Sequence, residues 1–233
     1  MNFGLIIAGG VGSRFGAEIP KQFVEINCKP IILYTLEAFQ KAKDIDNIAV
    51  VCINGWDDYI RNLAHKFGIS KLMTITAGGN TRFESIYNGI LSLKDMANES
   101  DYILIHDAVR ACVSEDIIHD SVLVANRFGA SLTVARCFDT MFVSDNGEEI
   151  DSIYPREKLF KGQTPETLRY DIALKAYAEA KDRGYLIDSP TSLLMKLGIN
   201  VGLSKGNQGN IKITTQDDIT FFRTFLNRRM EKK

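Results

Sequence analysis

The feature that most constrains the fold is an alternation between short apolar runs and longer amphipathic segments. The apolar runs are rich in β-branched residues and cover 3–8, 47–53, 72–79 and 101–110. The segments between them, 30–43, 56–68 and 81–95, place apolar residues at helical spacing. Strands that alternate with helices at these lengths predict an α/β fold with a doubly wound, mostly parallel sheet.

The carboxyl ends of these predicted strands carry glycines or charged residues. Examples are "AGG" after the first run, "AGG" after the third and "HDAVR" after the fourth. In a doubly wound sheet, ligands bind beyond the carboxyl ends of the strands. The sequence therefore predicts a ligand site along one edge of the sheet.

The second half of the chain has a different pattern. Residues 131–165 hold β-rich pieces around the turn sequence "DNGEE", which predicts an extended hairpin that leaves the main sheet. We predict a helix at 167–184, a strand at 201–206 and a closing helix from 215. Because no repeat or linker appears, we expect one domain over 1–233, with residues 136–160 as a dimerisation and substrate arm.

Composition excludes several classes of protein. A formal net charge of -1 argues against a protein that coats nucleic acid. The four cysteines, Cys28, Cys52, Cys112 and Cys137, form no C-x-x-C pair, which fits reduced thiols better than a zinc site or a disulfide framework. No apolar stretch approaches the roughly 20 residues of a membrane span, and no leader pattern precedes the first strand. We expect a soluble, cytoplasmic protein without a nucleic-acid or membrane partner.

The loop after the first strand, "AGGVGSRFGAEIPKQF" (8–23), is suited to a phosphate chain. Its glycines allow backbone N–H groups to approach phosphate oxygens closely. It lacks the G-K-[ST] ending of a P-loop, and Phe15 stands at the third glycine position of the dinucleotide fingerprint. A tight turn without any ligand is the alternative for a glycine loop taken alone. The cations Arg14 and Lys21 favour a triphosphate, because phosphoryl transfer requires charge stabilisation.

This loop resembles the signature loop of the cytidylyltransferases that activate polyol phosphates, a family that includes the D-ribitol 5-phosphate and 2-C-methyl-D-erythritol 4-phosphate enzymes. The resemblance continues in order through "AGGNTRFESIYNGI" (77–90), "IHDAVR" (105–110), "DT" (139–140), "YPREKLFKGQTPETL" (154–168) and "GNIKITTQDDI" (209–219). It implies a Rossmann-like sheet of the nucleotidyltransferase type, CTP and a polyol phosphate as substrates, and a divalent cation, Mg²⁺.

The resemblance also implies roles for individual residues. The catalytic set would be Arg14, Lys21 and Lys212. The nucleotide would contact Ala8, Gly9, Gly10, Gly12, Gly79, Asn80, Arg82, Ser85 and Ala108. The family often has an acidic residue where Asn80 stands.

Asp107 ends a predicted strand, where a carboxylate can hold Mg²⁺ against a triphosphate. A helix N-cap is the alternative role for Asp107. His106 is expected to be structural, because a phosphate nucleophile is already ionised at neutral pH and requires no general base.

The acceptor would be bound by Asp139, Thr140, Arg156 and Asp188. Arg156 offers the planar donor fork that suits a phosphate. In the family the arm swaps between two subunits, so Thr140 and Arg156 would complete the partner's site. That implies a homodimer.

Several alternatives stay open. The "AGG" loop and Phe142 favour ribitol 5-phosphate as the acceptor over methylerythritol phosphate, while Ala111 departs from both branches. A sugar-1-phosphate nucleotidyltransferase and a nucleotide-binding regulator without activity are further hypotheses. A dinucleotide-dependent dehydrogenase fits least, for the loop reasons given above.

Overall fold

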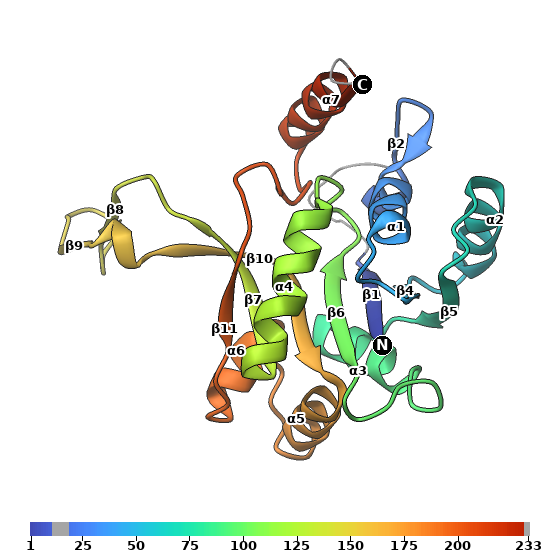
Figure 1. Cartoon of the computed structure of the whole chain (residues 1–233). Coiled ribbons are helices and arrows are strands. Elements are labelled where there is room, and N and C mark those ends of the chain that lie inside the picture. The colour runs from blue at the N-terminus through green and yellow to red at the C-terminus, as the bar shows by residue number, and fades with distance from the viewer. Residues whose placement is uncertain (11–18, 231–233) are drawn as a thin grey trace.

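A seven-stranded sheet forms the centre of the protein (Figure 1). The computed structural model describes residues 1–10 and 19–230. The strands are β1 (Asn2–Ala8), β2 (Glu25–Ile26), β3 (Lys29–Pro30), β4 (Asn47–Cys52), β5 (Leu72–Ala77), β6 (Tyr102–Asp107), β7 (Ala130–Arg136), β8 (Met141–Val143), β9 (Ser152–Tyr154), β10 (Phe160–Arg169) and β11 (Gly202–Lys205).

The sheet has the order β11-β7-β10-β6-β1-β4-β5. Strand β1 pairs in parallel with both β4 and β6, β4 pairs in parallel with β5, and β7 pairs in parallel with β11. Strand β10 is antiparallel to both of its neighbours, β6 and β7. The predicted α/β fold with a mostly parallel sheet is confirmed.

Helices cover both faces of this sheet, as a doubly wound fold requires. Apolar residues of α1, α2 and α4 pack on one face, and those of α3, α5 and α6 pack on the other. Helix α7 joins a third cluster, together with β2 and residues around Val109 and Ile213. The helices are α1 (Ile31–Lys41), α2 (Asp57–Phe67), α3 (Arg82–Leu91), α4 (Glu115–Phe128), α5 (Tyr170–Asp182), α6 (Pro190–Lys196) and α7 (Gln216–Met230), with short 3-10 turns η1 (Lys21–Phe23) and η2 (Arg156–Lys158).

The helix predicted at 167–184 begins later than expected. Residues 167–169 belong to β10, whose Thr167 and Leu168 pair with β6 and β7 inside the sheet. Pairing on both sides outweighs the local helical pattern, so α5 begins at Tyr170. We did not predict α4 and α6, although each has a serine N-cap, Ser114 and Ser189.

The predicted hairpin is present and leaves the main sheet. Strands β8 and β9 pair with each other in antiparallel fashion and form a separate two-stranded sheet. Figure 1 shows them at the end of an arm that extends beyond β7 and β10, away from the other elements.

In the part of the chain that the structure describes, no helix is both long enough and apolar enough to cross a lipid bilayer.

Candidate active site

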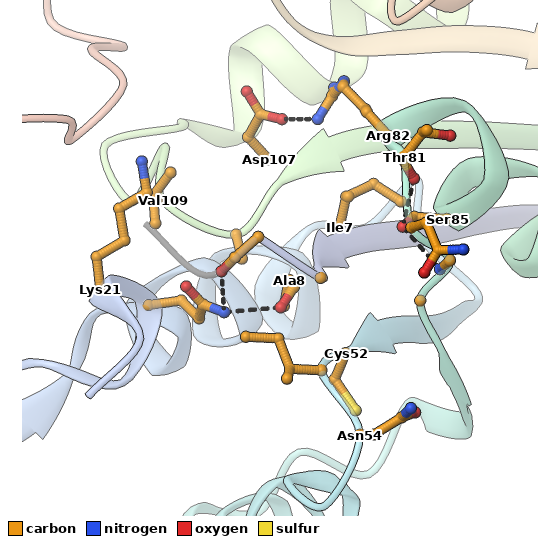
Figure 2. A pocket seen from close by; sticks show the side chains of 18 of the residues that line it. Ile7, Ala8, Lys21, Cys52, Asn54, Thr81, Arg82, Ser85, Asp107 and Val109 are labelled. Atoms are coloured by element: carbon orange, nitrogen blue, oxygen red, sulfur yellow. Dashed lines mark hydrogen bonds and ion pairs between the residues drawn. The ribbon is translucent and has the colours of Figure 1, made fainter. Parts of the chain in front are cut away.

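A cavity of about 540 Å³ lies at the carboxyl ends of β1, β4, β5 and β6, where the sequence predicts a ligand site (Figure 2). Most of the predicted nucleotide-binding residues line it. The lining comprises Ile7, Ala8, Gly9, Gly10, Lys21, Gln22, Cys52, Ile53, Asn54, Gly78, Gly79, Asn80, Thr81, Arg82, Ser85, Asp107, Ala108, Val109 and Lys212. Gly12 and Arg14 lie outside the described residues.

The glycines on this wall allow a close approach between the loops that follow β1 and β5. A Cβ atom on Gly9 would lie 3.2 Å from the Ser85 Oγ, and one on Gly78 would lie 3.1 Å from the same atom. Ser85 Oγ accepts a hydrogen bond from the Gly79 N–H and donates one to the Thr81 carbonyl. Ser85 therefore fixes the loop that carries Gly79 and Asn80.

Helix α3 begins beside this loop. Thr81 is its N-cap, and its Oγ1 accepts a hydrogen bond from the Glu84 N–H. The Glu84 carboxylate accepts one in return from the Asn80 N–H. This arrangement resembles a capping box and places Arg82 in the first turn, at the mouth of the cavity.

Asp107 ends β6 at the centre of a cluster of three cationic side chains. Its Oδ1 lies 2.7 Å from Arg82 Nη1, and its Oδ2 lies 3.0 Å from Lys212 Nζ and 3.6 Å from Arg110 Nε. Figure 2 shows Arg82 and Asp107 joined in this way. Burial alone would raise the pKa of Asp107, but the charges of Arg82, Lys212 and Arg110 outweigh it and hold that pKa well below its usual range. Asp107 is therefore ionised, and it gathers positive charge at the cavity.

His106 is held on both ring nitrogens. Thr164 Oγ1 lies 3.0 Å from Nδ1, and the Arg110 carbonyl lies 3.3 Å from Nε2. The side chain is fully buried, and burial lowers the pKa of His106 to about 4 against the opposing charge of Asp107. A neutral, enclosed imidazole agrees with the structural role expected for His106.

Lys21 opens the short turn η1, which joins two walls of the cavity. Gln22 Nε2 donates hydrogen bonds to the carbonyls of Ala8 and Gly10 at 2.7 and 3.0 Å. The ring of Phe23 stacks on Trp56, with centroids 4.0 Å apart and an interplanar angle of 4°. These contacts position the Lys21 backbone between the glycine loop and the segment after β4.

The structure does not bring the four predicted acceptor residues together at one place. Arg82 Nε donates a hydrogen bond to the Asp188 carbonyl at 3.1 Å, so Asp188 lies next to the cavity mouth. Asp139 forms an exposed ion pair with Lys161 at 3.7 Å. Thr140 directly precedes β8 and Arg156 begins η2, so both belong to the arm. None of the four predicted acceptor residues belongs to the cavity lining of the described chain.

A buried carboxylate fixes the segment that carries Asp188. Glu166 accepts hydrogen bonds from the Thr191 N–H, the Thr191 hydroxyl and the Ser189 hydroxyl at 2.9, 2.7 and 3.0 Å. Burial raises the pKa of Glu166, and these hydrogen bonds act against that rise. Glu166 thereby ties β10 to the start of α6.

Several residues at the cavity escaped the sequence analysis. Cys52 ends β4, and Ile53 and Asn54 follow it. Their signal was the break "CING" at the carboxyl end of a strand adjacent to β1. Thr164 was also missed, although it lies in the quoted segment 154–168. Its Oγ1 contacts His106 and accepts a hydrogen bond from the Asp107 N–H. Burial of Cys52 raises its thiol pKa to about 11, so the thiol is protonated at neutral pH.

Comparison with known sequences agrees with this geometry. The family model described as 2-C-methyl-D-erythritol 4-phosphate cytidylyltransferase matches residues 3–228. A ribitol-5-phosphate cytidylyltransferase of Lacticaseibacillus paracasei is 35% identical over 225 residues, covering 95% of this chain and 96% of its own. A 2-C-methyl-D-erythritol 4-phosphate cytidylyltransferase of Clostridium perfringens is 38% identical over 224 residues, covering 95% and 97%.

Solved structures show the same fold. The 2-C-methyl-D-erythritol 4-phosphate cytidylyltransferase of Francisella tularensis superposes with a TM-score of 0.77 at 28% identity, covering 96% of this chain and 98% of its own. The 4-diphosphocytidyl-2C-methyl-D-erythritol synthase of Anaerococcus prevotii reaches a TM-score of 0.83 at 24% identity, covering 97% and 98%. The chain therefore belongs to the 2-C-methyl-D-erythritol 4-phosphate cytidylyltransferase family, and it is a nucleotidyltransferase.

Proposed function

We propose that this chain transfers CMP from CTP to D-ribitol 5-phosphate, yielding CDP-ribitol and pyrophosphate. An oxygen of the acceptor's phosphate forms a bond to the α-phosphorus of CTP, and the bond from that phosphorus to the bridging oxygen of the β-phosphate breaks. The observation that carries the proposal is the cluster of Arg82, Arg110 and Lys212 around Asp107, beside a glycine-lined cavity that also receives Lys21.

The cationic groups act on charge that develops at the phosphates. Lys212 and Lys21 both line the cavity, on the segments after β11 and before β2. Lysine ammonium groups aimed at the α-phosphate and the leaving pyrophosphate stabilise an in-line transfer. Asp107 holds Lys212 and Arg82 in place before the substrate arrives, which lowers the reorganisation needed during the reaction. No proton transfer is required, in keeping with a neutral His106.

We propose Mg²⁺ as the cofactor, with Asp107 as its protein ligand. Mg²⁺ commonly takes one or two carboxylates and fills its remaining positions with phosphate oxygens and water. Asp107 is the one carboxylate among the described residues that line the cavity, and an ionised carboxylate offers about four lone pairs, so Asp107 would hold Mg²⁺ alongside its ion pairs with Arg82, Lys212 and Arg110. Within the described ranges, no group of three or more His, Cys, Asp or Glu side chains offers a closed metal site. When bound, Mg²⁺ would neutralise charge on the phosphate oxygens.

We propose that the arm of a second copy completes the acceptor site. The arm exposes several large apolar side chains, among them Phe138, Phe142, Ile150, Ile153 and Tyr154. Apolar surface gathered on one projecting element marks an interaction surface. A second copy is the fitting occupant, because a two-fold dimer would pair like arms and bring the partner's Thr140 and Arg156 to this cavity.

Ribitol 5-phosphate is favoured over methylerythritol 4-phosphate by the arm and the first loop. Phe142 stands where the isoprenoid branch usually has a lysine, and it is more than half exposed on β8, where it can meet the partner or the acceptor. The "AGG" that begins the glycine loop also resembles the ribitol branch. The relatives named for the two acceptors match nearly the whole chain at similar identity, so methylerythritol 4-phosphate is the second candidate.

The test is pyrophosphate release with CTP and Mg²⁺, run in parallel on the two acceptors. Release with ribitol 5-phosphate alone is the expected result. Release with methylerythritol 4-phosphate alone would overturn the proposed acceptor and keep the cytidylyltransferase reaction. A series without metal and a series with GTP or ATP in place of CTP would test the roles of Mg²⁺ and of the base pocket.

A further inference from the structure

Gln22 is a buried polar side chain for which the reaction has no direct use. Its exposed fraction is 2%, and its Nε2 contacts the carbonyl oxygens of Ala8 and Gly10. An amide nitrogen carries two hydrogens, so this pair of contacts uses its full donor capacity. The side chain thus links the turn that carries Lys21 to the first residues of the glycine loop.

The two hydrogen bonds determine how peptide groups face the cavity. In a trans peptide the carbonyl and the following N–H point to opposite sides. By holding the Ala8 carbonyl, Gln22 therefore fixes the direction of the Gly9 N–H. Both held carbonyls carry partial negative charge, which would repel phosphate oxygens if it faced them. Gly9 and Gly10 lack the side chains that would restrict these peptide planes, so an external constraint has more influence here than elsewhere.

The neighbours of Gln22 hold the same turn from both sides. Lys21 precedes it and lines the cavity, while Phe23 follows it and stacks on Trp56. Trp56 N donates to the Ile53 carbonyl, and Ile53 itself lines the cavity. Residues 21–23 therefore connect the glycine loop, a candidate catalytic lysine and the wall after β4 through contacts within one chain.

We propose that Gln22 is a positioning residue for the phosphate chain of the nucleotide. It holds the Ala8 and Gly10 carbonyls away from the phosphates, and it sets the position of Lys21 relative to the glycine loop. This role rests on the proposed binding of CTP and adds a residue that acts through others. Its effect falls on the phosphates and leaves the base and ribose contacts unchanged.

The test compares Gln22→Met with the wild-type chain. Methionine keeps the length of the side chain and removes both donors. We expect the Kd of CTP to rise about tenfold, because the freed peptide groups must be ordered when the phosphates bind, at a cost comparable to that of one hydrogen bond. We also expect kcat to fall as Lys21 is displaced. Binding of cytidine, which has no phosphate, is expected to change less than twofold. Calorimetry on CTP and competition by cytidine give the two constants.

Gln40→Met is the matched control. Gln40 is a partly buried glutamine whose amide bonds Ser70 Oγ and the Lys71 N–H, remote from the cavity lining. We expect its variant to bind CTP as the wild type does. Equal weakening of CTP and cytidine in Gln22→Met, or the same CTP affinity in both variants, would overturn the proposal.

A second variant, Gln22→Glu, keeps the size of the side chain and places a carboxylate against two carbonyl oxygens. A larger loss of CTP affinity than in Gln22→Met, again without loss of cytidine binding, would support the proposal. Failure of both variants to fold, seen by circular dichroism, would make Gln22 a folding residue and overturn it. Wild-type CTP binding in the same titrations tests the proposed function separately, since its absence would reject that function before any variant is compared.

Discussion

The nucleotide cavity and the arm differ in how complete each is within one chain. Several polar groups at the cavity have partners within the chain: Asp107 has three cations, Ser85 and Glu84 fix the loop after β5, and Gln22 holds the loop after β1. The arm instead exposes its apolar side chains, with Phe138 at 68% and Ile150 at 66%. One region is preorganised by its own chain, and the other presents surface that a monomer leaves uncovered.

This difference separates the two halves of the proposed reaction. CTP is the same substrate whichever acceptor is used, so donors that the chain holds in place before binding suit its triphosphate. In the proposed dimer the arm of a second copy would complete the acceptor site, so specificity for the acceptor would depend on residues that two chains bring together. We therefore expect substitutions at the cavity to affect chemistry with any acceptor, and substitutions on the arm to affect acceptor binding alone.

The largest effect is expected from Lys21→Ala. Removal of a group that stabilises developing phosphate charge lowers kcat by roughly 10²–10³-fold, while the Kd of CTP is expected to change less than tenfold. Initial rates of pyrophosphate release and calorimetry on CTP provide the two values. Lys43→Ala, at an exposed position after α1, is the control and should retain wild-type rates. Unchanged turnover in Lys21→Ala would remove Lys21 from the catalytic set.

The pH dependence of stability tests whether His106, beside the nucleotide cavity, is held neutral by burial. Its pKa is about 4 in the folded chain against an ordinary value of 6.5. Between these values the unfolded chain binds a proton that the folded chain does not, so the free energy of unfolding falls as the pH drops from 6.5 to 4. The total is about 3 kcal/mol at most.

Urea unfolding at several pH values measures this dependence. His106→Asn should have a shallower decline than the wild type over that window, whatever its stability at pH 7. An identical slope in the two proteins would show that His106 titrates normally.

On the arm, Arg156→Ala is expected to raise the KM of the acceptor roughly 10–100-fold, because a charge-assisted contact to its phosphate is lost. The Kd of CTP should stay at the wild-type value. Arg127→Ala, on α4 away from the arm, serves as the control. An unchanged acceptor KM would exclude Arg156 from the site.

The smallest effect is expected from Phe142→Lys, which tests acceptor choice. A lysine there resembles the isoprenoid branch, so we expect the ratio of kcat/KM for ribitol 5-phosphate over methylerythritol 4-phosphate to fall a few fold. Competition between the two acceptors in one assay measures that ratio directly. An unchanged ratio would show that residues outside the arm determine the preference between the two acceptors.

The sequence predicted the regular part of the fold because its patterns are local. The apolar run 47–53 is typical of a buried strand, and the segment 56–68 has apolar residues at helical spacing. Glycines or charged residues mark the ends of such segments. Asp107 was identifiable for the same reason, since it ends a predicted strand. Lys21 was identified as one of two cations in the glycine loop and by the family resemblance. The end of β10 was mispredicted because Thr167 and Leu168 are held by pairing with distant strands.

Contacts between distant segments explain what the sequence did not reveal. Arg82 is 25 residues from Asp107, and Lys212 reaches the same carboxylate from near the other end of the chain. In the sequence, Gln22 is one residue of a loop motif. Its proposed positioning role follows only from its burial and its hydrogen bonds to two carbonyls. No spacing rule predicts such encounters, because the topology of the sheet creates them.

Mixing two impaired variants would test the central claim most directly, namely that one chain binds the nucleotide and the arm of another completes the acceptor site. Lys21→Ala and Arg156→Ala chains would be unfolded together, refolded in equal amounts and assayed with CTP, Mg²⁺ and ribitol 5-phosphate at a concentration well below the wild-type KM, where each variant alone is nearly silent. In a mixed dimer with swapped arms, one of the two sites carries both defects and the other carries neither, so activity should recover to roughly a quarter of the wild-type value. Activity no higher than the mean of the two variants alone would contradict the account and place both residues in the site of a single chain.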